Sequence, residues 1–306
     1  MNIARSVLAA LAAGALTASA WAADGKVTIG VSLASDTNPF YIAVKDGIQK
    51  KAREMGVDAV FVTANEDAAR QISGIQDLIA RGVDALLVSP IDSAAVVPAY
   101  QMAGGANIPV VSLVRFVNSP YQKLEVTFDW KEIGHKVGVR IGDEIGRKGK
   151  VAVIAGPVGA QLFRDLAAGF KSAIAAYPDI KIVYDKDVAL TREAGLKSAE
   201  DALSAHPDLA AIYGGNDEVA LGAVQAVAAA GRAGKTVVAG LNGVPPAIKA
   251  VKDGSLLLTY DLNPTGWGAA AFDAAVAYAR GKSVTLKDIN LPSTLVDRSN
   301  VDHYLK

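Results

Sequence analysis

Short apolar runs and amphipathic segments alternate along the chain. Residues 26–33 form an apolar, β-branched run that predicts a strand. In the next segment, 39–55, apolar residues recur at spacings of three and four, which predicts a helix. Pro39 suits the first turn of that helix, and Gly56 suits its end.

The same alternation continues to the end of the chain. Further strands are predicted at 58–62, 83–88, 108–113, 124–128, 150–154, 181–184, 210–213, 236–240 and 256–261. Further helices are predicted at 69–81, 93–104, 132–147, 161–177, 194–205, 218–230, 245–253 and 266–281. Short strands that alternate with longer helices are typical of βαβ units and parallel sheets, so the fold class is α/β.

The number of predicted strands bears on the domain organisation. One sheet could hold all of them, but two sheets of about five or six strands agree better with the usual size of a domain. The pattern breaks near residues 128–130 and then begins again, without a linker rich in Pro, Gly or Ser. We therefore expect two doubly wound parallel-sheet lobes joined by short segments that form a hinge.

The first residues have the pattern of a secretory signal peptide. Arg5 is the only charge before Asp24, an apolar run spans 7–18, and a small-x-small cleavage pattern ends at Ala22. The alternative, a transmembrane anchor, needs about 20 apolar residues, more than this run provides. We expect residues 1–22 to be removed on export. Because the chain has no Cys to carry a lipid anchor, we expect a freely soluble periplasmic protein.

Charge and reactive residues exclude several classes of function. The chain has 31 basic and 31 acidic side chains, and removal of 1–22 takes away only Arg5, so that 30 basic residues face 31 acidic ones. This balance argues against nucleic acid as a partner. The three histidines show no metal-binding spacing, and no GxSxG or phosphate-loop motif occurs. We expect no metal, no cofactor and no catalysis.

Polar and aromatic side chains gather where the predicted strands end. In doubly wound sheets, ligands meet the loops at the carboxyl ends of the strands. Arg, Asn and Asp hydrogen-bond well to neighbouring hydroxyls, and aromatic rings cover the C–H face of a sugar. Taken singly, such residues are more often helix caps or core residues, but their joint placement points to a polyol site. The candidates are Asp36, Asn38, Phe40, Tyr41, Arg115, Asp129, Trp130, Arg164, Asn216 and Asn242.

A series of short motifs carries a resemblance to a known family. In chain order they are Asn38-Pro39-Phe40-Tyr41, Lys45-Asp46-Gly47, Asp77-Leu78-Ile79, Arg81-Gly82-Val83-Asp84, Pro90-Ile91-Asp92-Ser93, Ala106-Asn107-Ile108-Pro109-Val110, Ala205-His206-Pro207-Asp208 and Asn216-Asp217-Glu218-Val219-Ala220-Leu221-Gly222. From about residue 26 to residue 296, the chain resembles the periplasmic ribose-binding proteins, of the type I fold shared with galactose- and arabinose-binding proteins. The likeness to DNA-binding repressors of the same core fold is weaker, because those begin with a helix-turn-helix rather than a signal peptide.

The resemblance implies a transport role and a division of the chain. Such proteins deliver a bound sugar to an ABC-type permease in the inner membrane, and some also present it to a chemoreceptor. The implied hinge crossings lie near 128/129, 262/263 and 290/291, which gives an N-terminal lobe of 24–128 plus 263–290 and a C-terminal lobe of 129–262 plus 291–306. We expect the protein to act as a monomer.

Only some of the binding-pocket residues implied by the resemblance are present in this chain. The residues that match sugar-holding positions are Asn38, Phe40, Tyr41, Arg115, Arg164 and Asn216. The departures are Val114 and Asn242 where relatives have Asp, Leu262 near a usual Gln, Leu190 near a usual aromatic residue, and Trp130 at a usual Asn. Both arginines are therefore kept, while two carboxylates that accept from sugar hydroxyls are missing.

These departures argue against ribose in its usual pose. A buried Arg without its carboxylate leaves donors unsatisfied unless the ligand or another acid supplies acceptors. Asp36, Asp129 and Asp261 are acids that could compensate. We expect a modified sugar, a polyol or a sugar acid as the ligand, and we expect Arg164→Ala to remove most of the binding.

Two other classes of function stay open at this point. A sensory co-receptor that hands its ligand to a chemoreceptor or a membrane kinase would use the same closed surface as a transport receptor. A secreted α/β hydrolase or isomerase is disfavoured by the missing nucleophile and metal motifs.

Overall fold

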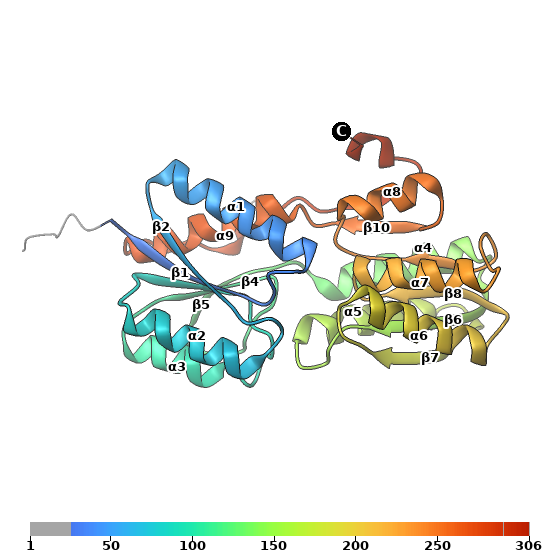
Figure 1. Ribbon diagram of the computed structural model, residues 1–306, viewed down its shortest axis with the longest axis horizontal. Helices are drawn as coiled ribbons and strands as arrows, with labels where there is room; N and C mark the ends of the chain where they lie inside the picture. The colour runs from blue at the N-terminus through green and yellow to red at the C-terminus, as the bar shows by residue number, and fades with distance from the viewer. Residues whose placement is uncertain (1–25, 290, 306) are drawn as a thin grey trace, which may run out of the picture.

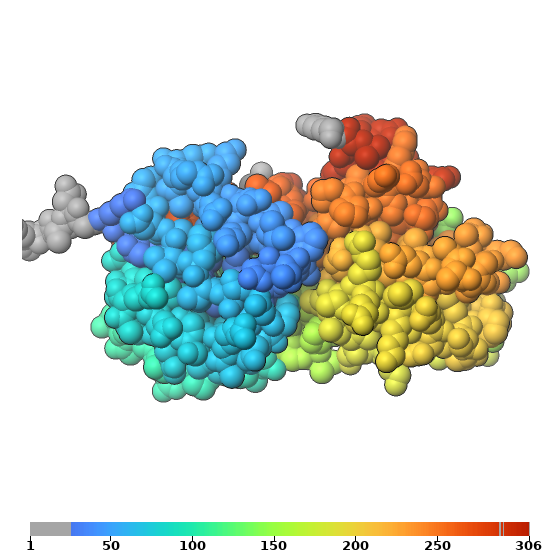
Figure 2. All heavy atoms as spheres, in the orientation of Figure 1, coloured from blue at the N-terminus to red at the C-terminus, as the bar shows by residue number. Residues whose placement is uncertain are grey.

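The computed structural model describes residues 26–289 and 291–305; the expected signal peptide, 1–22, and the expected crossing at Asn290 lie outside them. Two lobes lie side by side along the length of the molecule, each built on one sheet with helices on both faces (Figure 1). In the space-filling view the blue part of the chain and the yellow part form separate masses that meet along one boundary (Figure 2). The predicted architecture of two α/β lobes is confirmed.

The first lobe combines the start of the chain with one helix from near its end. Its elements are β1 (Thr28–Leu33), α1 (Pro39–Met55), β2 (Asp58–Thr63), α2 (Ala68–Ala80), β3 (Ala85–Val88), α3 (Val97–Gly105), β4 (Val110–Leu113), β5 (Gln122–Val126), α9 (Pro264–Ala279) and the short 3₁₀ helix η1 (Leu286–Asp288). The strands are parallel, in the order β2-β1-β3-β4-β5. Helices α1 and α9 pack together on one face of the sheet, and α2 and α3 cover the other (Figure 1).

The second lobe repeats this winding. Its elements are α4 (Trp130–Glu144), β6 (Lys148–Ala155), α5 (Gln161–Ile174), β7 (Asp179–Asp187), α6 (Arg192–Ala205), β8 (Leu209–Gly214), α7 (Asp217–Ala229), β9 (Val237–Ala239), α8 (Pro245–Asp253), β10 (Leu258–Asp261), β11 (Thr294–Asp297) and the 3₁₀ helix η2 (Val301–Tyr304). The sheet runs β7-β6-β8-β9-β10-β11, and only β11 is antiparallel to its neighbour. In this winding order, the carboxyl ends of the strands open a crevice at the switch point, between β1 and β3 in one lobe and between β6 and β8 in the other.

Local sequence explains how these elements begin and end. Helix α1 begins after Asn38, whose side chain accepts a hydrogen bond from the backbone N–H of Phe40 at 3.0 Å, and Pro39 fits its first turn. The helix ends at Gly56, whose φ of 65° suits a residue without a Cβ. Strands β3 and β4 are buried at every position, as expected for apolar runs inside a parallel sheet.

The start of one helix and one edge strand are the differences from the sequence prediction that have a clear local cause. The helix expected over 93–104 begins only at Val97, because the Asp92 carboxylate accepts from the backbone N–H groups of Ala94 and Ala95 and holds a turn there. The strand Thr294–Asp297 was not predicted. It is short, it lies antiparallel at the edge of the sheet, and only one of its residues is buried, so it lacks an apolar run.

Three pairs of helices approach each other at backbone distance. The contact positions are Gly47 and Gly268 between α1 and α9, Gly134 and Gly169 between α4 and α5, and Gly195 and Gly222 between α6 and α7. A Cβ atom at any of these positions would overlap the backbone of the facing helix. The glycines therefore set how closely these helices cover their sheets.

An aromatic cluster packs beside the crossing from β5 to α4. Phe128 and Trp130 flank the crossing, and the ring of Trp267 in α9 lies 4.6 Å from the first and 5.8 Å from the second, centroid to centroid. Phe40 joins the cluster at 6.0 Å from Trp267. Because its rings come from both lobes, the cluster packs the hinge on its inner side.

Candidate functional site

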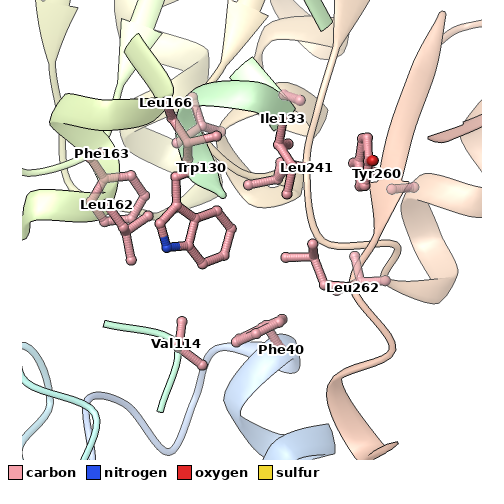
Figure 3. Close-up of a cluster of buried hydrophobic side chains, with 14 of the residues drawn as sticks. Phe40, Val114, Trp130, Ile133, Leu162, Phe163, Leu166, Leu241, Tyr260 and Leu262 are labelled. Carbon is pink, nitrogen blue, oxygen red and sulfur yellow. The ribbon is translucent and has the colours of Figure 1, made fainter. Parts of the chain in front are cut away.

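A small cavity lies between the lobes, at the carboxyl ends of both sheets. Its lining residues are Asn38, Phe40, Tyr41, Val114, Arg115, Trp130, Leu162, Phe163, Leu190, Asn216, Leu241, Asn242 and Leu262. Figure 3 shows Val114 and Phe40 facing Trp130, Leu162 and Phe163 across this space. This inner cavity measures about 30 Å³, room for about two water molecules.

A wider space, the outer cleft, adjoins the inner cavity. It measures about 800 Å³, which lies within the usual range for small-molecule sites. Asn38 and Leu190 line both spaces. Both lobes also contribute to the cleft, for example through Glu66 from the first and Asp187 from the second.

Arg115 follows β4 and is the most deeply buried cation of the site, with 1 % of its side chain exposed. Its Nη1 and Nη2 donate to the two carboxylate oxygens of Glu66 at 2.9 and 2.8 Å, a bidentate pair. The guanidinium also lies over the rings of Tyr41 and Phe163, 5.8 and 5.5 Å from their centroids. Burial acts to lower the pKa of Arg115, but Tyr41 and Glu66 beside it raise the pKa above its ordinary value, so Arg115 stays charged.

A strained turn places Arg115. Val114 has a φ of 65°, a left-handed value that β-branched residues strongly disfavour. The backbone N–H of Arg115 donates to the carbonyl oxygen of Leu113 at 2.7 Å, which closes a γ-turn around Val114. Such strain is often found where a binding site holds the chain in a required conformation.

Aromatic side chains from both lobes line the inner cavity and are themselves anchored. The Tyr41 hydroxyl is within 2.8 Å of the Ser89 hydroxyl, and burial raises the pKa of Tyr41. Trp130 is 3 % exposed, and its Nε1 donates to the Thr127 hydroxyl at 2.9 Å. These rings are therefore rigid surfaces on which a ligand can pack.

Asn216 is the buried polar residue that the second lobe contributes at the end of β8. It is 2 % exposed, and its Oδ1 accepts from the backbone N–H of Val219 at 2.9 Å, which caps α7. Its Nδ2 is buried and meets no acceptor within the described ranges. The amide therefore has one end fixed by the helix and one donor left over.

The loop after β9 is fastened to the same region by a buried acid. Asp217 accepts from the Thr259 hydroxyl at 2.7 Å and from the backbone N–H of Val244 at 3.0 Å. Burial raises the pKa of Asp217 to about 7. The loop carries Asn242, which has a φ of 133° and pairs with Asp261 in an isolated bridge.

The structure brings most of the sequence-predicted site residues together. The predicted residues that line the inner cavity are Asn38, Phe40, Tyr41, Arg115, Trp130, Leu190, Asn216 and Asn242. Four others do not line it: Asp36, Asp129, Arg164 and Asp261. Whether each of the twelve contacts a ligand stays a prediction.

Local roles explain where those four side chains lie. Asp36 is exposed, and Asp129 is an exposed cap of α4 that accepts from the backbone N–H of Glu132 at 2.9 Å. Arg164 is exposed on α5, where it donates to the Val158 carbonyl oxygen and to the Gln161 side chain. Asp261 accepts from the backbone N–H of Asn263 at 2.8 Å, and burial raises its pKa.

The acid that compensates Arg115 is not one of the three acids expected from the sequence. Glu66 takes that place, because the loop after β2 turns back toward β4 through two left-handed residues, Asn65 and Glu66, with φ of 51° and 57°. Glu66 was not among the predicted site residues, because those were taken from the ends of other strands. The rule that site residues follow parallel strands applies equally to the end of β2.

Between residues 26 and 289 and from 291 to 305, no three His, Cys, Asp or Glu side chains are grouped as a metal site. Within the same ranges, no helix combines the length and the apolar character needed to cross a bilayer.

The fold and this site can be compared with known proteins. A family model described as a periplasmic binding protein domain matches residues 29–283. The chain therefore belongs to the periplasmic binding protein family. The ribose import binding protein RbsB of Bacillus subtilis is 34% identical over 268 residues, which cover 88% of this chain and 86% of that protein. The xylitol-binding protein of Mycolicibacterium smegmatis is 28% identical over 311 residues, covering 99% and 88%.

Solved structures agree with this membership. An ABC transporter solute-binding protein from Mycobacterium smegmatis with bound glycerol has a TM-score of 0.87 and 34% identity, covering 92% of this chain and 98% of that chain. A periplasmic solute-binding protein of an ABC transporter from Actinobacillus succinogenes, with bound D-allose, has a TM-score of 0.85 and 29% identity, covering 91% and 100%. The expected type I fold is confirmed.

Proposed function

We propose that this protein is the substrate-binding component of an ABC-type importer and captures a sugar or polyol between its lobes. One observation carries the proposal. Arg115 Nε in the first lobe and Asn216 Nδ2 in the second are buried donors on cavity-lining residues, and neither meets an acceptor among the residues described. Leaving a buried donor unpaired costs about 1–3 kcal/mol. A ligand with an acceptor oxygen toward each lobe removes that cost at both positions.

The rest of the lining supports a sugar or polyol. Phe40, Trp130 and Leu262 offer apolar surface to the C–H groups of such a ligand, while Asn38 and Asn242 offer further polar groups. The relatives named for ribose and xylitol, and the structures with bound glycerol and D-allose, support the same class of compound. The apolar residues at 114, 190 and 262 disfavour ribose in the pose of its own receptors.

Binding is proposed to proceed by closure of the lobes. The inner cavity, of about 30 Å³, is smaller than a sugar, so the lobes must part to admit the ligand and the lining side chains must move to hold it. Ser93 in the first lobe bonds across to the second: its N–H donates to the Gly159 carbonyl oxygen at 3.0 Å, and its hydroxyl accepts from the Gln161 N–H at 3.1 Å. A ligand that bonds to both lobes favours the closed population in which these contacts form.

The physiological setting is proposed from the family and the N-terminal sequence. After removal of residues 1–22, the monomer would act in the periplasm and deliver its ligand to a permease in the inner membrane, with no catalytic step. A sensory co-receptor for a chemoreceptor or membrane kinase would use the same closed form. Neighbouring genes for a permease and an ATPase would favour the transport role. Conversion of a bound compound into a new one would instead favour the enzyme alternative.

A thermal-shift screen over sugars, polyols and sugar acids tests the proposal. A ligand that binds only the folded state, at 100 times its Kd, adds about 2.7 kcal/mol to the free energy of unfolding. We expect at least one sugar or polyol to raise the Tm by several degrees. A screen without any stabilising compound of this class would contradict the proposal.

A further inference from the structure

We infer that Glu66 sets the charge class of the ligand: by neutralising Arg115 it makes this site select neutral polyols and sugars over sugar acids. The inference rests on the proposed function, because it concerns the ligand of the same cavity. It names a residue outside the pocket pattern that the family resemblance supplies, since that pattern has its carboxylates at positions 114 and 242, where this chain has Val and Asn.

The geometry leaves Arg115 little capacity for an anionic ligand. Both terminal nitrogens already donate to Glu66, at 2.9 and 2.8 Å, so a carboxylate occupies the end-on edge of the guanidinium and the Nε side is left for a ligand. Only Nε is left without an acceptor in the described part of the chain. The N–H groups on that side suit hydroxyl or ring oxygens of a neutral ligand, because Glu66 already balances the charge of Arg115.

Because Arg115 is buried, its pairing with Glu66 determines the net charge that a ligand meets in the cavity. Arg115 is 1 % exposed and lies between the rings of Tyr41 and Phe163, one from each lobe. In such a place water screens charges poorly, and an uncompensated guanidinium would strongly favour a carboxylate beside it. With Glu66 in place, the pair is neutral as a whole, and a second carboxylate would meet the charge of Glu66.

Glu66 also stands where an entering ligand would meet it. Its side chain is 34 % exposed, and it lines the outer cleft, whereas Arg115 lines the inner cavity. A carboxylate has about four lone-pair sites, and Arg115 uses one on each oxygen. The remaining sites can accept from ligand hydroxyls, the task that position 114 cannot perform here.

The backbone holds Glu66 in this place at some strain. Asn65 and Glu66 are consecutive non-glycine residues with left-handed φ values of 51° and 57°. The N–H of Glu66 donates to the carbonyl oxygen of Ala34, after β1, at 2.8 Å, which ties the turn to the switch point of the sheet. Strain kept at a site is a reason to look for function there, and the pair with Arg115 supplies one.

The test is calorimetric titration of wild type and Glu66→Gln with matched neutral and acidic probes: xylitol with xylonate, ribose with ribonate, and allose with allonate. Asp187→Asn is the matched control, because Asp187 is an exposed acid of the outer cleft and is not a partner of Arg115. We expect wild type and control to favour a neutral probe. We expect Glu66→Gln to lose roughly tenfold in affinity for that probe and to gain roughly tenfold or more for its aldonate.

Each result decides the inference. A preference of the wild type for an aldonate would overturn the inference without any variant. This measurement therefore decides the inference even if Glu66→Gln does not fold. Equal selectivity of Glu66→Gln and Asp187→Asn would overturn it while leaving the proposed function intact. If wild type binds no probe, these compounds are excluded as ligands and the thermal-shift screen decides the proposed function; a gain of aldonate binding by Glu66→Gln would then still support the role of Glu66, and no gain would overturn it.

Discussion

At the scale of single residues, the side chain of Asn216 shows how one amide can serve folding and binding together. Its oxygen caps α7 through the Val219 N–H, and its nitrogen is a buried donor on the wall of the inner cavity. The sequence predicted Asn216 as a site residue, with a helix cap as the alternative. The structure shows that Asn216 does cap a helix. The two roles use different atoms and can therefore be separated by substitution.

Asn216→Ser is expected to separate them. Ser is about as good a cap as Asn, so the free energy of unfolding should fall by less than about 1 kcal/mol, but the Nδ2 donor is lost. We expect the affinity for the ligand to fall roughly tenfold, as for one lost hydrogen bond in a buried site. Urea unfolding and calorimetric titration of the same preparation measure the two effects. Unchanged affinity would remove Asn216 from the binding account.

The buried carboxyl of Asp217 makes stability depend on pH. Burial raises its pKa from the ordinary 3.8 to about 7. Between about pH 4 and pH 7 the folded state therefore holds a proton that the unfolded state has lost, so the free energy of unfolding falls as the pH rises through that window. The slope from this group is about 1.4 kcal/mol per pH unit at most.

Asp217→Asn is expected to lose this pH dependence. The variant also changes the hydrogen bonds to Thr259 and Val244, but that effect is the same at every pH. Denaturant unfolding of both proteins at several pH values between about 4 and 7 gives the difference curve. A stability difference that does not change with pH would show that Asp217 is already ionised throughout this range.

At the scale of elements, the periodicity of apolar residues predicted most helices and strands, because it reports which face each element buries. It could not predict the strand Thr294–Asp297, which has one buried residue and pairs at an edge. It also placed the start of α3 too early, because the side-chain turn at Asp92 overrides the apolar pattern. Local hydrogen bonds of this kind leave no periodic trace in a sequence.

The candidate site was predictable to a similar degree and for a related reason. The carboxyl ends of parallel strands converge, so residues after β1, β4 and β8 were expected to meet, and Asn38, Arg115 and Asn216 line one cavity. Side-chain direction was not predictable. Arg164 lies on α5 near the cavity but points its guanidinium to Val158 and Gln161, while Glu66 reaches Arg115 from a left-handed turn.

Close helix packing predicts which glycines are essential. Gly268→Ala would place a Cβ against the carbonyl oxygen of Val44 in α1, and overpacking of this kind costs roughly 1–3 kcal/mol. Gly105→Ala is the matched control, because it lies at the exposed end of α3 with open space where its Cβ would be. We expect the first to lower the Tm by several degrees and the second to leave it unchanged or raise it. Equal effects would show that α1 and α9 can move apart.

At the scale of the whole molecule, the proposed function requires both lobes to bind the same ligand. Each lobe places its switch point at the shared cavity, and each leaves one buried donor there, on Arg115 and on Asn216. The aromatic cluster of Phe128, Trp130 and Trp267 packs the hinge between them. The proposed closure brings together two half-sites that each leave one buried donor without an acceptor, and it would couple ligand capture to the shape that a permease recognises.

The most direct test is calorimetric titration of the mature protein with the best neutral sugar or polyol from the thermal-shift screen. We expect a saturable isotherm with one ligand per chain and a negative heat-capacity change, because the proposed closure buries the apolar walls of the inner cavity around the ligand. Micromolar affinity would correspond to about −8 kcal/mol. The absence of saturable binding to any neutral sugar or polyol would contradict the central claim that the two lobes capture such a molecule between them.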